Sequence, residues 1–134
     1  MDPAYSACPL PKIPEKTGDG EHFPKPGEKL SVHFTCALVT TGETVDSSRG
    51  EHVTSQNGIT VRKTKHPLEL TLGSSENIKG FEIALASMSL GERSSFRIPA
   101  ELGYGSKGKG TAIPPDAELD FDIELLGINQ MYSK

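Results

Sequence analysis

The sequence predicts an α+β domain, in which one helix packs on the apolar face of an antiparallel β-sheet. Most patterned segments alternate apolar and polar residues with a period of two, as half-buried strands do. A single segment spaces its apolar residues three or four positions apart, which is typical of a helix. Strands therefore do not alternate regularly with helices, and 134 residues with a hydrophobic fraction of 34% suffice for one compact core.

Four segments carry the strand pattern. The first is "KLSVHFTCALV" (29–39), where every second residue from Leu30 to Leu38 is apolar. The same alternation appears in "LELTLG" (68–73), "RSSFRIP" (93–99) and "ELDFDIELLGI" (118–128). In the last segment an acidic residue occupies each intervening position up to Glu124. We expect this strand to turn one face to the core and the other to water.

The predicted helix lies in "NIKGFEIALASM" (77–88). Its apolar residues recur at helical spacing, at Ile78, Phe81, Leu85 and Met88. Small polar residues before it are candidates for the N-terminal cap, namely Ser74, Ser75 and Asn77. Gly91 is the candidate for its C-terminal end.

Two polar regions flank or interrupt these elements. Residues 1–20 contain four prolines and few apolar residues, which predicts a flexible arm ahead of a domain spanning 21–134. Residues 49–66 form a long polar insertion. Within the insertion, "QNGI" (56–59) predicts a tight hairpin turn, because Asn-Gly readily adopts positive φ angles. The following "ITVRK" is a candidate for a short edge strand.

Composition and charge exclude some classes of function and predict the cellular compartment. A net charge of -4 and a pI near 5.5 argue against non-specific nucleic-acid binding, which needs clustered cations. No window approaches the roughly 18 to 20 apolar residues of a membrane span, and the N-terminal residues lack the pattern of a signal peptide. Cys8 and Cys36 are expected to be free thiols in a reducing compartment. We therefore expect a soluble, cytoplasmic domain.

The glycine-rich stretch "YGSKGKGTAIPP" (104–115) admits two interpretations, a phosphate-binding loop or a flap over an apolar pocket. Gly103 to Lys109 has the G-x-x-x-x-G-K spacing of a phosphate loop, but Gly110 stands where serine or threonine would bind magnesium. Such a loop must also open a helix, and Ile113-Pro114-Pro115 disfavours helical angles at once. The nucleotide interpretation is therefore disfavoured, and Lys107 and Lys109 are expected to be a solvated loop tip.

No residues point to metal, cofactor or covalent chemistry. The sequence has no H-E-x-x-H, C-x-x-C or G-x-S-x-G motif. Asp46 follows a strand-like segment, where a turn-forming aspartate is the ordinary explanation. Tyr104, Phe81 and Phe121 would individually be ordinary strand-end or core aromatic residues.

Taken in order, these segments resemble the FKBP-type peptidyl-prolyl cis-trans isomerases, the macrolide-binding immunophilins. The stretches that carry the resemblance are "FPKPGEKLSVHFTC", "DSSRG", "HPLELTLG", "IKGFEIALASMSLGERSSFRIPAELGYGSKGKG" and "IPPDAELDFDIELL". They extend from about Thr17 to the C-terminus. The resemblance implies a twisted antiparallel sheet wrapped around one short α-helix, and it favours the flap interpretation of the glycine run.

The resemblance also implies the residues of a pocket. The implied catalytic residues are Asp46, Tyr104 and Phe121. The residues implied to bind substrate or macrolide are Phe34, Val45, Leu68, Leu70, Ile78, Phe81 and Ile113. The backbone amide of Ile78 and the hydroxyl of Tyr104 would hold ligand carbonyls. The chain departs from the common family pattern with Phe81 for tryptophan, Phe34 for tyrosine, Cys36 for glycine, and Val45 and Leu68 for phenylalanine.

The implied activity is rotation about Xaa-Pro bonds of proline-containing polypeptides, which assists folding and needs no metal or cofactor. The resemblance further implies a monomer that binds macrolides such as tacrolimus and rapamycin, and a drug-bound form that captures calcineurin. An alternative is a non-catalytic module that binds proline peptides or macrolides, favoured by the substituted pocket positions. A further alternative is that "PLPKIP" (9–14) is itself a ligand for a neighbouring molecule's pocket.

Overall fold

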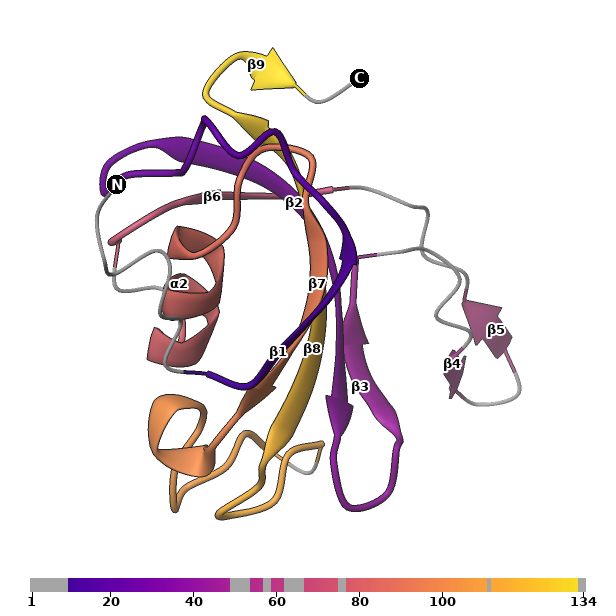
Figure 1. The fold of residues 1–134 in the computed structure, drawn as a ribbon. Helices are drawn as coiled ribbons and strands as arrows, with labels where there is room; N and C mark the ends of the chain where they lie inside the picture. Colours follow the sequence, from indigo (N-terminus) through magenta and orange to yellow (C-terminus); the bar gives the residue numbers. More distant parts are fainter. Residues whose placement is uncertain are drawn as a thin grey trace.

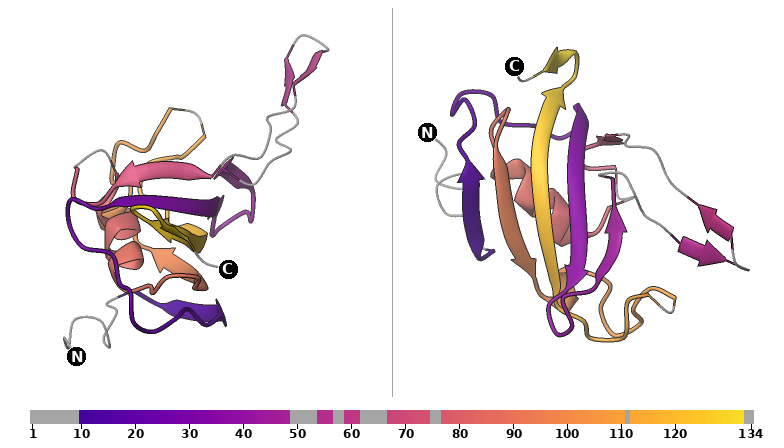
Figure 2. Two further views of the ribbon diagram at one scale, coloured as in Figure 1. Left: turned by 90° about the horizontal axis from the view of Figure 1, so that it is seen from above. Right: turned by 90° about the vertical axis from the view of Figure 1, so that its right-hand side faces the viewer.

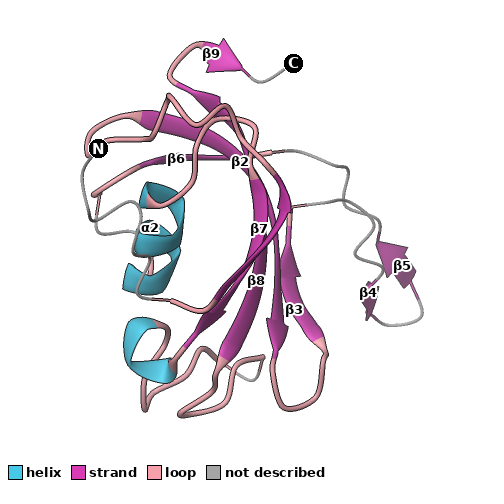
Figure 3. Cartoon of the chain, viewed as in Figure 1, coloured by secondary structure: helices cyan, strands magenta, loops and turns pink. Residues whose placement is uncertain are grey.

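The computed structural model describes residues 10–48, 54–56, 59–61, 67–74, 77–110 and 112–132. Strands predominate in these residues (Figure 3). The strands are β1 (Lys12–Lys16), β2 (Lys29–Leu38), β3 (Thr44–Ser47), β4 (Thr54–Gln56), β5 (Ile59–Val61), β6 (Leu68–Thr71), β7 (Arg93–Ile98), β8 (Leu119–Ile128) and β9 (Met131–Tyr132). The helices are α2 (Lys79–Ala86) and a short 3-10 turn, Ala100–Leu102.

Seven strands form one antiparallel sheet, whose main path runs β1-β7-β8-β2-β3. Figure 1 shows this sheet curving around α2, and the right-hand view of Figure 2 shows the five strands side by side with the helix behind them. The core lies between the helix and the concave face of the sheet. The predicted α+β fold, a sheet wrapped around one helix, is confirmed.

β2 is the strand that brings the two halves of the sheet together. One of its edges pairs with β8 along Leu30–Leu38. Its other edge is shared, because β6 pairs with Lys29–Val32 and β3 pairs with residues 35–37. The chain therefore leaves this edge after β3 and returns to it in β6. Side chains from β2, β3, β6 and β8 thus line one cavity, as described below.

The polar insertion between β3 and β6 contains the predicted hairpin. β4 and β5 form a separate two-stranded antiparallel sheet, with Gln56 opposite Ile59. This pairing agrees with the turn predicted at "QNGI", whose central residues 57 and 58 lie outside the described residues. The remainder of the insertion predicted at 49–66 lies outside the described residues.

The ends of α2 differ from the predicted ends. Ile78, with an extended backbone (φ -65°, ψ 149°), occupies the N-cap position, and no side chain of the described residues caps this end. Ser75, one of the candidate caps, lies outside the described residues. At the other end the cap is Ser87 rather than Gly91, because the Ser87 hydroxyl donates to the Ala84 carbonyl at 2.7 Å. A 3-10-type bond from the Met88 amide to the Leu85 carbonyl (3.1 Å) tightens the same turn.

The helix sits close against the sheet because Gly80 has no side chain. A Cβ at this position would overlap Cγ2 of Ile98 on β7. Phe81 and Leu85 are both buried on the same face of the helix. The Glu82 carboxylate accepts a hydrogen bond of 2.6 Å from the Gly73 amide, which ties the first turn of α2 to the end of β6. No helix in the described part of the chain is long and apolar enough to cross a membrane.

β1 corrects the prediction that residues 1–20 form a flexible arm. From Lys12 to Lys16 the chain pairs antiparallel with β7, with Pro14 opposite Ser94. The strand was not predicted because proline lacks the N–H that a strand normally donates. An edge strand tolerates that loss. The Lys12 ammonium secures the strand by reaching the Glu92 carboxylate at 2.7 Å. Residues 1–9 lie outside the described residues.

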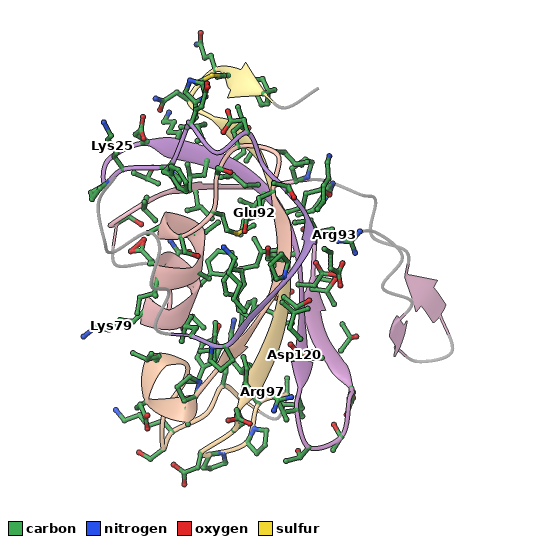
Figure 4. All side chains as sticks on the ribbon, in the orientation of Figure 1. Lys25, Lys79, Glu92, Arg93, Arg97 and Asp120 are labelled. Carbon is green, nitrogen blue, oxygen red and sulfur yellow. The ribbon has the colours of Figure 1, made fainter. Side chains whose placement is uncertain are left out.

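Glu92 and Arg93, at the start of β7, lie in opposite environments (Figure 4). Glu92 is 8% exposed and pairs with Lys12. Arg93 donates two hydrogen bonds to the Asp122 carboxylate, at 3.1 and 2.8 Å, on the outer face of the sheet. Asp120 on the same face of β8 is exposed, whereas Leu119, Phe121, Ile123 and Leu125 are buried. The predicted two-faced character of the last strand is confirmed.

Candidate functional site

A cavity of ≈ 590 Å³ opens between the N-terminal end of α2, the sheet and the flap, here residues 104–115. This volume is in the range of small-molecule sites. Nine of the predicted pocket residues line it, namely Phe34, Val45, Asp46, Leu68, Ile78, Phe81, Tyr104, Ile113 and Phe121. Leu70 does not. It follows Leu68 by two residues on β6, which places it about 7 Å further along the strand and out of reach.

Three phenylalanine rings form the floor of the cavity, each from a different element. Phe81 of α2 lies 5.7 Å from Phe34 of β2, nearly edge to face, and 5.4 Å from Phe121 of β8. Phe34 and Phe121 stack at 6.1 Å. These distances are typical of favourable aromatic pairs. The cluster belongs to the core and to the cavity at once, since Phe81 and Phe121 are 4% and 5% exposed.

A β-bulge explains how two consecutive residues of β3 line the same cavity. Successive side chains of a regular strand point to opposite faces of the sheet. In β3, however, Asp46 pairs with Cys36 while Thr44 pairs with Ala37, so Val45 is the extra residue. The bulge lets Val45 and Asp46 both face the cavity. The Asp46 side chain is exposed, and its Oδ1 accepts a hydrogen bond of 2.9 Å from the Ser47 amide.

The polar groups of the cavity come from the helix start and the flap. The amide of Ile78 has no acceptor among the described residues, as expected at the N-terminus of a helix. The Tyr104 side chain is half-buried at the opposite wall. Both groups are therefore available to a ligand. The described residues contain no cluster of histidine, cysteine, aspartate and glutamate that could hold a metal ion.

The described residues of the flap, 104–110 and 112–115, are joined by backbone hydrogen bonds. Lys109 and Ile113 exchange both backbone bonds, at 2.8 and 3.1 Å, and the Gly108 amide donates to the Tyr104 carbonyl at 3.1 Å. This arrangement presses Ile113 into the core, where it is 4% exposed. Lys109 is exposed, as expected for a solvated loop tip, and it also lines the cavity, which was not predicted.

Five lining residues were not predicted: Cys36, Asn77, Lys109, Gly110 and Ala112. The register of the sheet explains Cys36, which lies between Asp46 on β3 and Phe121 on β8. The alternation of β2 placed Cys36 in the core but could not place it at the cavity wall. Asn77 precedes the Ile78 amide, and its Nδ2 is buried without a partner among the described residues.

We expect the Cys36 thiol to be unreactive in the folded protein. Burial, and next the charge of Asp46, raises the pKa of Cys36 from 9.0 to about 12, and the thiolate is the reactive form. In a Cys8→Ser background, a disulfide reagent at pH 8 should label Cys36 only after unfolding in guanidinium. Labelling of the folded protein at the rate of a free thiol would contradict this.

The same pKa shift predicts a pH dependence of stability. The folded protein keeps the Cys36 proton between pH 9 and about 12, whereas the unfolded chain loses it. This contribution to the free energy of unfolding is therefore complete below pH 9 and is lost as the pH rises toward 12. Cys36→Ala should weaken the decline in that window, as measured by denaturant titration against the parent protein.

An antiparallel sheet around one helix, with an aromatic cavity at the helix start, defines a domain built to hold an apolar ligand. Comparison with known proteins gives its family. The family model described as FKBP-type peptidyl-prolyl cis-trans isomerase matches residues 20–126. The chain thus belongs to this family, which confirms the predicted resemblance and the predicted class of enzyme.

Individual relatives agree with this assignment. The chain is 40% identical to a Candida glabrata protein named FK506-binding protein 2, over 77% of this chain and 66% of the relative. It is 37% identical to a Schizosaccharomyces pombe protein named peptidyl-prolyl cis-trans isomerase, over 84% and 88% of the two chains. A crystal structure of a peptidyl-prolyl cis-trans isomerase from Pseudomonas syringae superimposes with a TM-score of 0.68 at 26% identity, covering 90% of this chain and 76% of that one.

Proposed function

We propose that the cavity accelerates rotation about Xaa-Pro bonds by removing the prolyl ring from water and by binding the twisted amide more tightly than either planar form. The observation that carries the proposal is an apolar floor of three phenylalanines below two available donors, the Ile78 amide and the Tyr104 hydroxyl. Folding of proline-containing polypeptides is the process that such an activity would assist.

The physical task is to lower a rotational barrier of roughly 18 to 20 kcal/mol, which arises from amide resonance. Rotation takes tens to hundreds of seconds without a catalyst. Water stabilises the polar planar amide, so an apolar cavity favours the less polar twisted form. Each tenfold acceleration needs about 1.4 kcal/mol of preference for the twisted form. Because no bond between heavy atoms breaks, the reaction requires neither a nucleophile nor a metal.

Each part of the cavity has a proposed role. Phe81, Phe121 and the aliphatic side chains around them bind the prolyl ring. The Ile78 amide and the Tyr104 hydroxyl hold the peptide carbonyls and fix the frame against which the bond turns. Asp46 places a carboxylate beside the rotating carbonyl and shapes the local electric field.

The first experiment is a protease-coupled isomerisation assay on a Leu-Pro peptide, run cold to slow the background, with and without tacrolimus. Acceleration that tacrolimus abolishes is the expected result, and it would support both the activity and its location. Acceleration without inhibition would contradict macrolide binding at this site. A folded sample that gives no acceleration would contradict the proposed catalysis.

Tyr104→Phe and Asp46→Ala should each lower kcat/KM by up to about tenfold, the cost of one lost polar interaction of roughly 0.5 to 1.5 kcal/mol. Both side chains are at least partly exposed, so the free energy of unfolding should change by less than about 0.5 kcal/mol. Glu43→Ala, on the exposed turn before β3, is the matched control for charge. Unchanged kcat/KM in both pocket variants would remove these residues from the mechanism.

A non-catalytic binding module is the second candidate function. The observation that favours it is the weak positioning of the Asp46 carboxylate, which is exposed and accepts a hydrogen bond from the Ser47 amide. With Phe34 in place of a tyrosine, no hydroxyl from β2 at that position can orient this carboxylate. In this case proline peptides, or macrolides such as tacrolimus and rapamycin, would bind in the cavity without faster isomerisation.

The remaining proposals concern the oligomeric state, the cellular compartment and a protein partner. We propose a monomer in the cytoplasm, and a drug-bound form that presents a surface to calcineurin. The support is the family membership and, among the relatives, the name FK506-binding protein. Co-sedimentation with calcineurin in the presence and absence of tacrolimus would test the last of these.

A further inference from the structure

Lys109 is held at the mouth of the cavity by the backbone of the flap. Its reciprocal bonds with Ile113 fix the position of its Cα, and its Nζ lies 5.3 Å from the centroid of the Tyr104 ring. A cation over an aromatic face is attracted by the ring, so this contact favours the Lys109 conformation that faces the cavity. Lys107, two residues earlier, is exposed like Lys109 but does not line the cavity.

The charge of Lys109 is not matched by an ion-pair partner in the described part of the chain. Two of the described lining residues are charged, Asp46 and Lys109, and they do not form an ion pair with each other. No described carboxylate pairs with the Lys109 ammonium. The cavity therefore presents an apolar floor with a separate ammonium at its mouth. Such a site attracts a ligand that is apolar at its centre and carries a negative charge nearby.

We propose that Lys109 selects substrates with an acidic residue next to the proline. In this arrangement the prolyl ring lies on the phenylalanine floor, and the carboxylate of the adjacent glutamate or aspartate pairs with the Lys109 ammonium. A free anion is a poorer candidate, because one lysine offers a single point charge without the several converging donors of an anion site. The inference rests on the proposed isomerase function and names a substrate preference of the same cavity.

The expected preference is modest, because an exposed ion pair contributes little. The measured range for such pairs corresponds to about two- to fivefold in kcat/KM. Salt screens an exposed pair, so the preference should shrink between 0.02 and about 1 M salt, where the Debye length falls to roughly 3 Å. The same salt increase should leave the turnover of an uncharged peptide comparatively unaffected.

The test measures kcat/KM for peptides that differ in one residue beside the proline, with glutamate, glutamine or lysine placed first before and then after it. The wild-type protein should prefer glutamate to glutamine at one of these positions by about two- to fivefold. Lys109→Met should abolish this ratio, and Lys109→Glu should invert it in favour of lysine. Lys107→Met is the matched control and should keep the wild-type ratio.

Equal turnover of the glutamate and glutamine peptides at both positions would overturn the inference. So would a glutamate preference that Lys109→Met leaves intact. The glutamine peptide separates this failure from failure of the catalytic proposal: wild-type protein that turns it over is an isomerase whatever the ratio. If no peptide is turned over, competition binding of the same glutamate and glutamine peptides decides whether Lys109 selects acidic ligands.

Discussion

Phe81→Ala is expected to lower the free energy of unfolding by about 3 to 5 kcal/mol and to raise KM together with it. Phe81 is 4% exposed and contacts both Phe34 and Phe121, so its removal opens a void at the junction of helix and sheet. The same void removes the floor on which a prolyl ring would rest. Denaturant titration and the isomerisation assay, run on one preparation, measure the two effects.

Phe81→Leu separates the two roles of this ring. Leucine refills most of the volume, so the loss of stability should be about 1 to 2 kcal/mol. The flat aromatic surface is nevertheless gone, and KM should still rise. Wild-type stability and wild-type KM in Phe81→Ala would show that Phe81 neither supports the core nor forms the floor.

Gly108→Ala is expected to reduce kcat/KM by about tenfold or more, through distortion of the flap. Gly108 has a φ of 67°, which disfavours any residue with a side chain. An added Cβ would overlap the carbonyl oxygen of Ile113 and lie 2.9 Å from the carbonyl carbon of Pro114. That carbonyl of Ile113 accepts the bond from Lys109 that closes the flap. Both atoms belong to the backbone, so the flap itself must move.

Gly105→Ala provides the control on the same flap. Gly105 has a similar φ of 62°, but a Cβ there would meet nothing within 4 Å. The two variants therefore share the conformational strain of roughly 1 to 2 kcal/mol and differ in the collision. If the structural argument is right, Gly105→Ala keeps most of its activity and Gly108→Ala does not. Equal losses in both would mean that strain, and not the collision, controls the flap.

Much of the fold could be predicted from the sequence because its main strands are buried on one face. The period of two in β2 and β8 reflects that burial directly, and so does the helical spacing around Phe81. β1 was not predicted because neither of its faces is largely buried. As an edge strand it has few buried side chains, and the contact that secures it joins Lys12 to Glu92, far apart in the sequence.

The cavity was predictable to the extent that it reuses core positions. Phe34 and Phe121 face inward on their strands, so alternation placed both in the core, and the family resemblance placed them in one pocket. The bulge at Val45 has no signature in the sequence, since it depends on the register between β2 and β3. Lys109 was assigned to solvent because a lysine among glycines ordinarily lies there, and it is indeed exposed; its position in the cavity lining was what the sequence did not predict. Its place at the cavity follows from long-range bonds within the flap.

β1 has a practical consequence for anyone who shortens the chain. The family model begins at residue 20, so a fragment cut to that boundary would lose the whole strand. β7 would then present a bare row of N–H and C=O groups, a template on which strands of other molecules can add. In the intact chain the outermost strand carries Lys12, Pro14 and Lys16, whose charges and missing N–H discourage such addition. β1 thus covers the edge of β7 and protects the protein against aggregation through strand addition.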